Sequence, residues 1–166
     1  MKSKILITLL LLVGLSLVGC QPAPTTHYLG AKANNLDIVN LVADQSGPQH
    51  WQDLYVTVDY RLDRKAGNLD IDGMLSFSDS VKANFTRVED LKLKLFLLDK
   101  DLSVVNYLQL TRSLSYSPEG ETHFSKTVKL DKNVVAFAFG YEGSFSENDP
   151  TGSTVRPVWK LPKTDQ

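Results

Sequence analysis

Three histidines and two close pairs of aspartates are the residues whose types could support metal or acid–base chemistry. The histidines are His27, His50 and His123, and no two of them have the i, i+4 or His-x-His spacing of a zinc site. We therefore expect three surface histidines and no bound metal.

The aspartate pairs are Asp70 with Asp72 and Asp99 with Asp101. Paired carboxylates can bind calcium or divide the acid and base roles in glycoside hydrolysis. However, Asp70 and Asp72 alternate along an expected strand, as on a solvated sheet face. Asp99 and Asp101 flank a lysine in an expected turn, where aspartate accepts hydrogen bonds from nearby backbone amides. We predict a solvated face and a turn rather than a metal or catalytic site.

Other catalytic patterns are missing from the sequence. It has no Gly-x-Ser-x-Gly elbow, no Ser-x-x-Lys pair and no glycine-rich phosphate loop. We find no catalytic constellation and therefore expect a protein without enzymatic activity and without a cofactor. The 18 basic and 19 acidic residues give a net charge of −1, which argues against nucleic-acid binding because that function needs a basic patch.

Residues 142–154 are polar apart from Phe145, and we interpret them as a long loop between two strands. A lone aromatic side chain in such a loop could anchor a protein partner or stack on a sugar. The alternative is that Phe145 packs back onto the end of the domain. The candidate binding residues are Phe145, Glu147, Asn148 and Asp149. Trp51 and Trp159 lie near expected strand ends, where core or rim positions are the simpler interpretation.

Alternation of apolar and polar residues with a period of two dominates the chain and predicts strands with one buried face. The expected strands cover residues 54–62, 69–77, 91–98, 102–110, 122–130, 134–141 and 155–161. Residues 36–43 fit either a helix or a strand, and we favour a strand because their surroundings are β. Residues 87–90 suggest a short helical turn, and Pro157 suggests that the last strand lies at a sheet edge.

These seven or eight strands predict an all-β fold, a two-sheet antiparallel sandwich of the immunoglobulin-like or transthyretin-like kind. A closed barrel is the alternative.

The N-terminus has the features of a secretory signal peptide. Lys2 and Lys4 precede an apolar run over residues 5–18, which is shorter than the roughly 20 residues that a membrane-spanning helix needs. A positive end followed by a short apolar core is typical of a secretory signal.

The run ends in Leu17-Val18-Gly19-Cys20, which resembles the lipobox of bacterial lipoproteins. The resemblance implies that signal peptidase recognises Leu17, Val18 and Gly19 and cuts after Gly19. It also implies that Cys20 carries diacylglycerol on its sulfur and a further acyl chain, such as palmitate, on its amino group. The alternative is an ordinary signal peptide with a chance cysteine.

The expected organisation is a signal peptide over residues 1–19, a lipidated cysteine with an extended tether over 20–34, and a sandwich domain over 35–166. By resemblance to enterobacterial sorting, Gln21 after the cysteine favours the outer membrane, with the domain facing the periplasm. We expect a non-catalytic interaction or structural module that docks another envelope protein. A small-ligand or glycan binder is the second interpretation, and a hydrolase using the acidic pairs is the third.

Overall fold

The structure, a computed structural model, describes residues 27–41, 47–115, 117–149 and 152–164. The predicted signal peptide, Cys20 and Gln21 lie outside this part of the chain. None of the helices in the described part is long and apolar enough to span a membrane.

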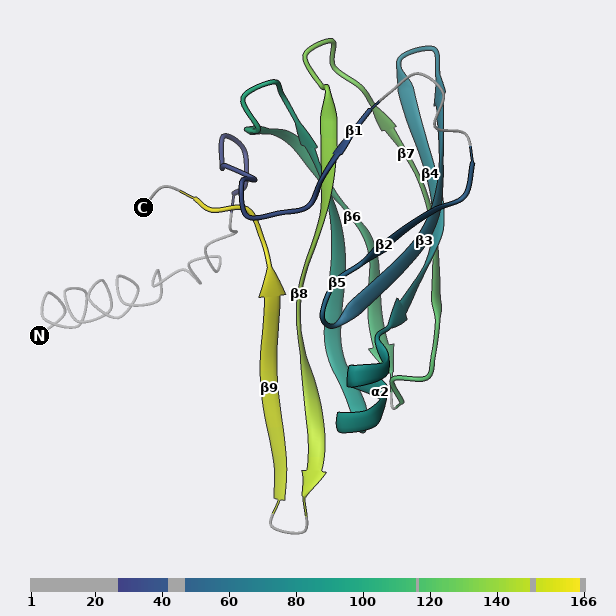
Figure 1. Cartoon of the computed structure of the whole chain (residues 1–166), viewed down its shortest axis with the longest axis vertical. Coiled ribbons are helices and arrows are strands. Elements are labelled where there is room, and N and C mark those ends of the chain that lie inside the picture. Colours follow the sequence, from purple (N-terminus) through teal and green to yellow (C-terminus); the bar gives the residue numbers. More distant parts are fainter. Residues whose placement is uncertain (1–26, 42–46, 116, 150–151, 165–166) are drawn as a thin grey trace, which may run out of the picture.

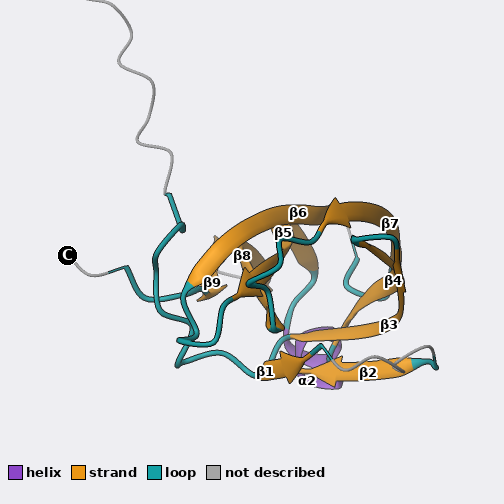
Figure 2. Ribbon diagram, turned by 90° about the horizontal axis from the view of Figure 1, so that it is seen from above, coloured by secondary structure: helices purple, strands orange, loops and turns teal. Residues whose placement is uncertain are grey.

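Nine strands in the described residues form two antiparallel sheets packed face to face, so the predicted all-β sandwich is confirmed (Figures 1 and 2). The four-stranded sheet has the order β2 (Gln49–Gln52), β3 (Val56–Lys65), β4 (Asn68–Phe77) and β7 (Thr122–Lys129). The five-stranded sheet contains β1 (Ile38–Asn40), β5 (Arg87–Leu98), β6 (Val104–Ser115), β8 (Ala136–Asp149) and β9 (Gly152–Lys160).

In the five-stranded sheet, β8 lies between β5 on one side and β1 and β9 on the other, and β6 is the far edge. The orders β3-β4-β7 and β5-β8-β9 correspond to A-B-E and C-F-G in an immunoglobulin-like sandwich. The two sheets are open and come closest where β6 approaches β7 (Figure 2).

The core forms because the alternating apolar residues of both sheets face each other. Leu91, Leu93, Leu95 and Leu97 of β5 are all fully buried. Tyr60 of β3 packs edge-on against Phe139 of β8, with ring centroids 5.0 Å apart, and so joins the two sheets. Trp51 is also buried, as predicted for a core position.

The N-terminal segment of the described chain packs across the outer face of the five-stranded sheet. We call residues 27–36 the strap. Its Tyr28, Ala31, Ala33 and Leu36 are buried in a second apolar cluster with residues of β5, β6 and β8: Phe96, Leu98, Val104, Ala136 and Ala138. The expected tether over residues 20–34 is therefore too long, because its last eight residues belong to the strap. The strap also explains why β5 is apolar on both faces at its C-terminal end.

A short helix, α2 (Asp79–Asn84), connects β4 to β5. Its N-cap is Ser78, whose side chain accepts a hydrogen bond from the Val81 amide. The predicted helical turn at residues 87–90 was wrong, because these residues begin β5 and pair with β8.

The predicted loop over residues 142–154 is also wrong, since residues 142–149 continue β8 and residues 152–154 begin β9. Pairing between β5 and β8 ends at Arg87 and Ser146, whereas pairing between β8 and β9 continues to Asp149 and Gly152. We call the projecting part, residues 147–149 and 152–154, the arm. Figure 1 shows it extending below the rest of the sandwich.

Candidate interaction surfaces

A buried aromatic cluster lies at the base of the arm, at the end of the sandwich. Phe145 is fully buried there, and its ring centroid lies 5.1, 5.8 and 5.9 Å from those of Phe85, Phe77 and Tyr55. The interpretation of Phe145 as a packed residue is confirmed, and it offers no surface to a ligand. The residue fixes the direction in which the arm leaves the sheet.

Polar contacts hold the strand at the base of the arm. The Ser146 hydroxyl donates to Glu89 at 2.9 Å, and the Ser146 carbonyl accepts a hydrogen bond from the Thr86 amide at 2.9 Å. Farther out, Glu147 lies 3.7 Å from Arg156 of β9. Asn148 and Asp149 belong to the arm through their backbones, which pair with Ser153 and Gly152. Three of the four candidate binding residues thus lie beyond the core, on a strand rather than on a loop.

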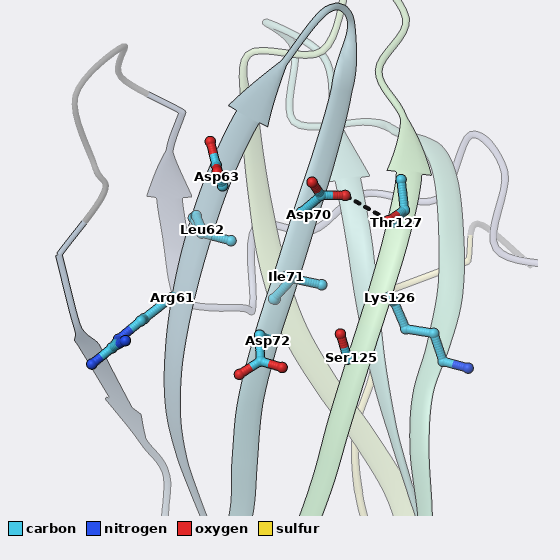
Figure 3. Close-up of a pocket in the computed structure, with 9 residues that line it drawn as sticks. All are labelled: Arg61, Leu62, Asp63, Asp70, Ile71, Asp72, Ser125, Lys126 and Thr127. Carbon is cyan, nitrogen blue, oxygen red and sulfur yellow. Dashed lines mark hydrogen bonds between the residues drawn. The ribbon is translucent and has the colours of Figure 1, made fainter.

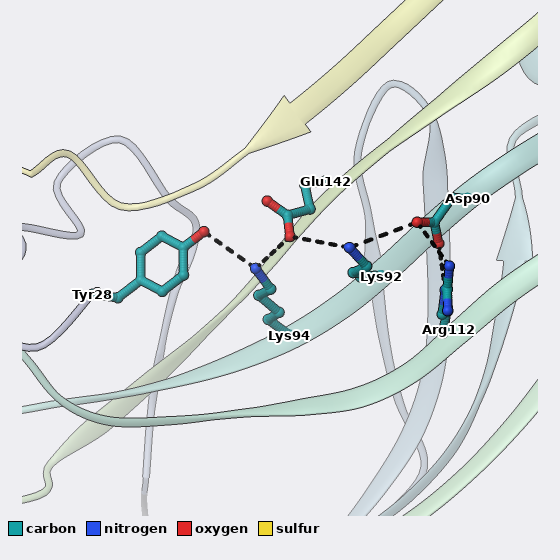
Figure 4. Close-up of polar contacts among 6 residues, drawn as sticks. All are labelled: Tyr28, Asp90, Lys92, Lys94, Arg112 and Glu142. Carbon is teal, nitrogen blue, oxygen red and sulfur yellow. Dashed lines mark hydrogen bonds and ion pairs between the residues drawn. The ribbon is translucent and has the colours of Figure 1, made fainter. Parts of the chain in front are cut away.

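A ladder of alternating charges crosses the outer face of the five-stranded sheet (Figure 4). Lys94 donates to Glu142 at 2.8 Å and to the Tyr28 hydroxyl at 3.2 Å. Lys92 lies 3.9 Å from Glu142 and 3.6 Å from Asp90. Arg112 completes the ladder with a two-nitrogen contact to Asp90 at 2.7 and 3.2 Å.

Lys94 fixes the strap to the sheet. Burial by itself lowers the pKa of this amine, but the hydrogen bonds to Glu142 and Tyr28 outweigh burial and raise it. The amine therefore keeps its charge over the physiological range. Tyr28 adds edge-on contacts to Phe96 and Tyr107, with ring centroids 5.2 and 5.1 Å apart. The start of the described chain is thereby held on this face.

β9 carries a row of exposed apolar residues on the same outer face. Val155 is 55% exposed and Trp159 is 67% exposed, with Pro157 exposed between them. Trp159 lies directly across from Glu142 of the ladder. Of the two predicted positions for Trp159, the core is wrong, because its neighbour in sequence, Val158, takes the inward position.

β9 is an edge strand, as Pro157 predicted, since in the described chain it pairs with β8 alone. The Lys160 carbonyl oxygen lies 2.5 Å from where a Cβ on Gly140 would stand, so this carbonyl faces β8. Backbone groups alternate in direction along a strand, so the nitrogen of Pro157 faces the free edge. The proline therefore removes a donor from the middle of that edge and opposes the addition of another strand.

The outer face of the four-stranded sheet is polar and slightly hollowed. A concavity of about 480 Å³ is lined by Arg61, Asp63, Asp70, Asp72, Ser125, Thr127 and the residues between them. Figure 3 shows Asp70 on β4 accepting a hydrogen bond from Thr127 on β7, at 2.5 Å. His123 contacts Asp72 at 3.1 Å, and His50 contacts Asp59 at 2.8 Å.

These contacts confirm the solvated-face interpretation of Asp70 and Asp72 and the surface positions of the histidines. His27 is also exposed, beside Tyr107. The turn interpretation of Asp99 is confirmed as well, because its carboxylate accepts hydrogen bonds from the Asp101 and Ser103 amides at 2.9 Å. Within the described ranges, the structure brings no three His, Cys, Asp or Glu side chains together in a way that could hold a metal ion.

A polar cluster that the sequence did not reveal closes one side of the sandwich. The Tyr141 hydroxyl donates to Asp53 at 2.7 Å, and Lys160 lies 3.4 Å from Asp53 and 2.7 Å from Asp37. Burial opposes the charge on Asp53, but Tyr141, the Leu54 amide and Lys160 together lower its pKa. Burial and the neighbouring carboxylate raise the pKa of Tyr141. No sequence motif links these residues, which come from four distant segments.

Comparison with known proteins gave no relative: no family model matches the chain, and no curated protein or solved structure is significantly similar to it.

Proposed function

We propose that this chain is a bacterial envelope lipoprotein whose β-sandwich is a non-catalytic interaction or structural module. In this proposal the signal peptide is removed after Gly19 and Cys20 carries the lipid. The anchor holds the domain at the outer membrane, facing the periplasm, and the arm docks a protein partner of the envelope. The anchor is supported by the lipobox resemblance, and docking is supported by the arm.

The arm is the observation that carries the docking proposal. In the described chain its strands pair only with each other, because pairing with β5 ends at Ser146, and Glu147 adds one ion pair to Arg156 at its base. A two-stranded hairpin is marginally stable alone, and here the aromatic cluster around Phe145 supports it at its base. The arm is polar and extends beyond the sandwich, so it is suited to contact a partner protein that the two sheets do not reach.

Photo-cross-linking in cells tests the docking. A photoreactive residue at Glu147 or Ser153 of the lipidated protein is expected to capture the same single envelope protein. Lys65, exposed at the β3–β4 turn on the other sheet, is the matched control and is expected to capture none. Equal capture at all three positions, or capture at Lys65 alone, would contradict docking by the arm.

The anchor has its own test. Mass spectrometry of the mature N-terminus is expected to find an acylated Cys20, and Cys20→Ala is expected to release the protein from membranes. A secreted Cys20→Ala form that fully replaces the native protein in cells would contradict a need for anchoring.

A small-ligand or glycan binder is the second candidate, favoured by the concavity on the four-stranded sheet. Arg61, Asp63 and Ser125 present donors and acceptors of the kind that bind sugar hydroxyls. Thermal shift against a panel of envelope glycans tests it, with Arg61→Ala as the control variant. Stabilisation of both forms, or of neither, would argue against this site.

A further inference from the structure

The two outer faces of the sandwich differ in where apolar side chains meet solvent. On the four-stranded sheet the outward positions are polar except for Met74, which is half-buried. On the five-stranded sheet, Leu114, Val155 and Trp159 point outward and are 64%, 55% and 67% exposed. The strap adds Leu29, which is 49% exposed. Four of the six large apolar side chains exposed in the described chain thus belong to this face or to the strap on it, the other two being Leu54 in the β2–β3 turn and Val135 before β8.

The N-terminal end of the described chain packs on the outer face of the five-stranded sheet. His27 lies beside Tyr107, and Tyr28 is held by Lys94 and by two ring contacts on the outer side of β5 and β6. The Gly30 amide also donates to the Val104 carbonyl at 2.8 Å. The chain that leads back to Cys20 therefore departs from the outer face of the five-stranded sheet.

The connection to the lipid is short compared with the domain. Seven residue steps separate Cys20 from His27, and a fully extended chain covers about 3.5 Å per residue, or roughly 25 Å in all. The 14 residues of β8 span roughly 45 Å at the rise of an antiparallel strand. A tether shorter than the strand keeps the attached face near the bilayer.

We infer that the outer face of the five-stranded sheet lies against the headgroup region of the membrane, with Trp159 as its interfacial side chain. This inference rests on the proposed lipid anchor at Cys20. Tryptophan favours the membrane–water boundary because its ring is apolar and its N–H can still bond to water or headgroups. The neighbouring ladder of Lys92, Glu142 and Asp90 pairs its charges internally, so it can remain hydrated at headgroup level.

The tip of the arm lies at the other end of β9 from Trp159. Trp159 lies seven residues along β9 from Gly152 at the arm, a separation of roughly 23 Å along the strand. The polar concavity of the four-stranded sheet faces the opposite way, toward the periplasm.

Tryptophan fluorescence tests the inference, because the chain has two tryptophans with different surroundings. Trp51→Phe leaves Trp159 as the only emitter, and Trp159→Phe leaves the buried Trp51 as the matched control. Each lipidated protein is reconstituted into phosphatidylethanolamine–phosphatidylglycerol vesicles with and without brominated acyl chains. We expect a blue shift and quenching by brominated lipid for Trp159 emission only, and neither effect for Trp51.

Flotation of the same vesicles separates this inference from the anchor. Protein that floats while Trp159 remains unquenched, with the emission of the soluble Cys20→Ala form, would overturn the membrane-facing orientation and leave the anchor intact. Lipidated protein that fails to float would overturn the anchor itself. A photoreactive residue at position 159 that captures a protein in cells, rather than phospholipid, would overturn the inference in favour of a protein partner on this face.

Discussion

Phe145→Ala tests whether the candidate binding segment is part of the core. The side chain would be exposed if it anchored a ligand, but in the structure it is fully buried against three aromatic rings. Truncating a buried phenylalanine to alanine costs about 3–5 kcal/mol, from lost transfer free energy and the cavity left behind. Typical domains have a free energy of unfolding of about 5–15 kcal/mol, so the variant loses a large part of its stability.

Urea denaturation of the soluble Cys20→Ala form, followed by circular dichroism, measures this cost. Trp159→Ala is the matched control, because removing an exposed side chain changes the free energy of unfolding by about 0.5 kcal/mol or less. If Phe145→Ala does not fold, Phe145→Leu gives a milder loss of about 1–2 kcal/mol that remains measurable. Equal midpoints for the position 145 variant and the control would refute the buried aromatic base of the arm.

Three further changes probe other parts of the structure. Pro157→Val restores an N–H at the free edge of β9, and we expect light scattering to show concentration-dependent self-association; a variant that stays as monomeric as its parent would argue against protection by the proline. Tyr141→Phe removes a hydrogen bond from Asp53 and should lower the free energy of unfolding at pH 7 by about 1 kcal/mol. Because the pKa of Asp53 is lower in the folded than in the unfolded chain, its carboxylate stabilises the fold at pH values above its ordinary pKa of 3.8. This stabilisation is lost as the pH falls through the pKa of the folded state. Tyr141→Phe should therefore show a smaller loss of stability on acidification than its parent, and an unchanged acid profile would contradict this coupling. Gly143→Ala places a Cβ 2.2 Å from the Asp90 carbonyl oxygen, so we expect a lower melting temperature by calorimetry, and an unchanged one would count against this close strand approach.

Much of the fold follows from local pattern. Residues such as Leu91, Leu93 and Leu95 alternate with lysines, and this alternation predicts a strand whatever its neighbours are. The Asp99 turn is equally local, because its carboxylate bonds to amides two and four residues later. The lipobox prediction also rests on the sequence alone and concerns residues outside the described chain.

The candidate site was only partly predictable. Residues 142–147 do alternate, but glycine and serine occupy half of the positions, so the period-two pattern lacks contrast and resembles a loop. Tyr28 and Ala31 carry no periodic signal, because a strap is buried by the sheet beneath it rather than by its own secondary structure. The exposure of Trp159 depends on which face of β9 points into the core, and its own segment does not encode that choice.

The sequence by itself predicted an all-β domain with a sandwich favoured over a closed barrel, most of its strands, and an edge position for β9. Only the tertiary structure decided which strands pair and which residues the strap covers, such as Phe96. It also decided that β8 and β9 extend beyond the end of β5 and form the arm. The physical reason is the separation in sequence over which each interaction acts. Alternation and turn chemistry act over a few residues, whereas pairing and burial depend on segments such as β5 and β8 that meet from about 50 residues apart in the chain.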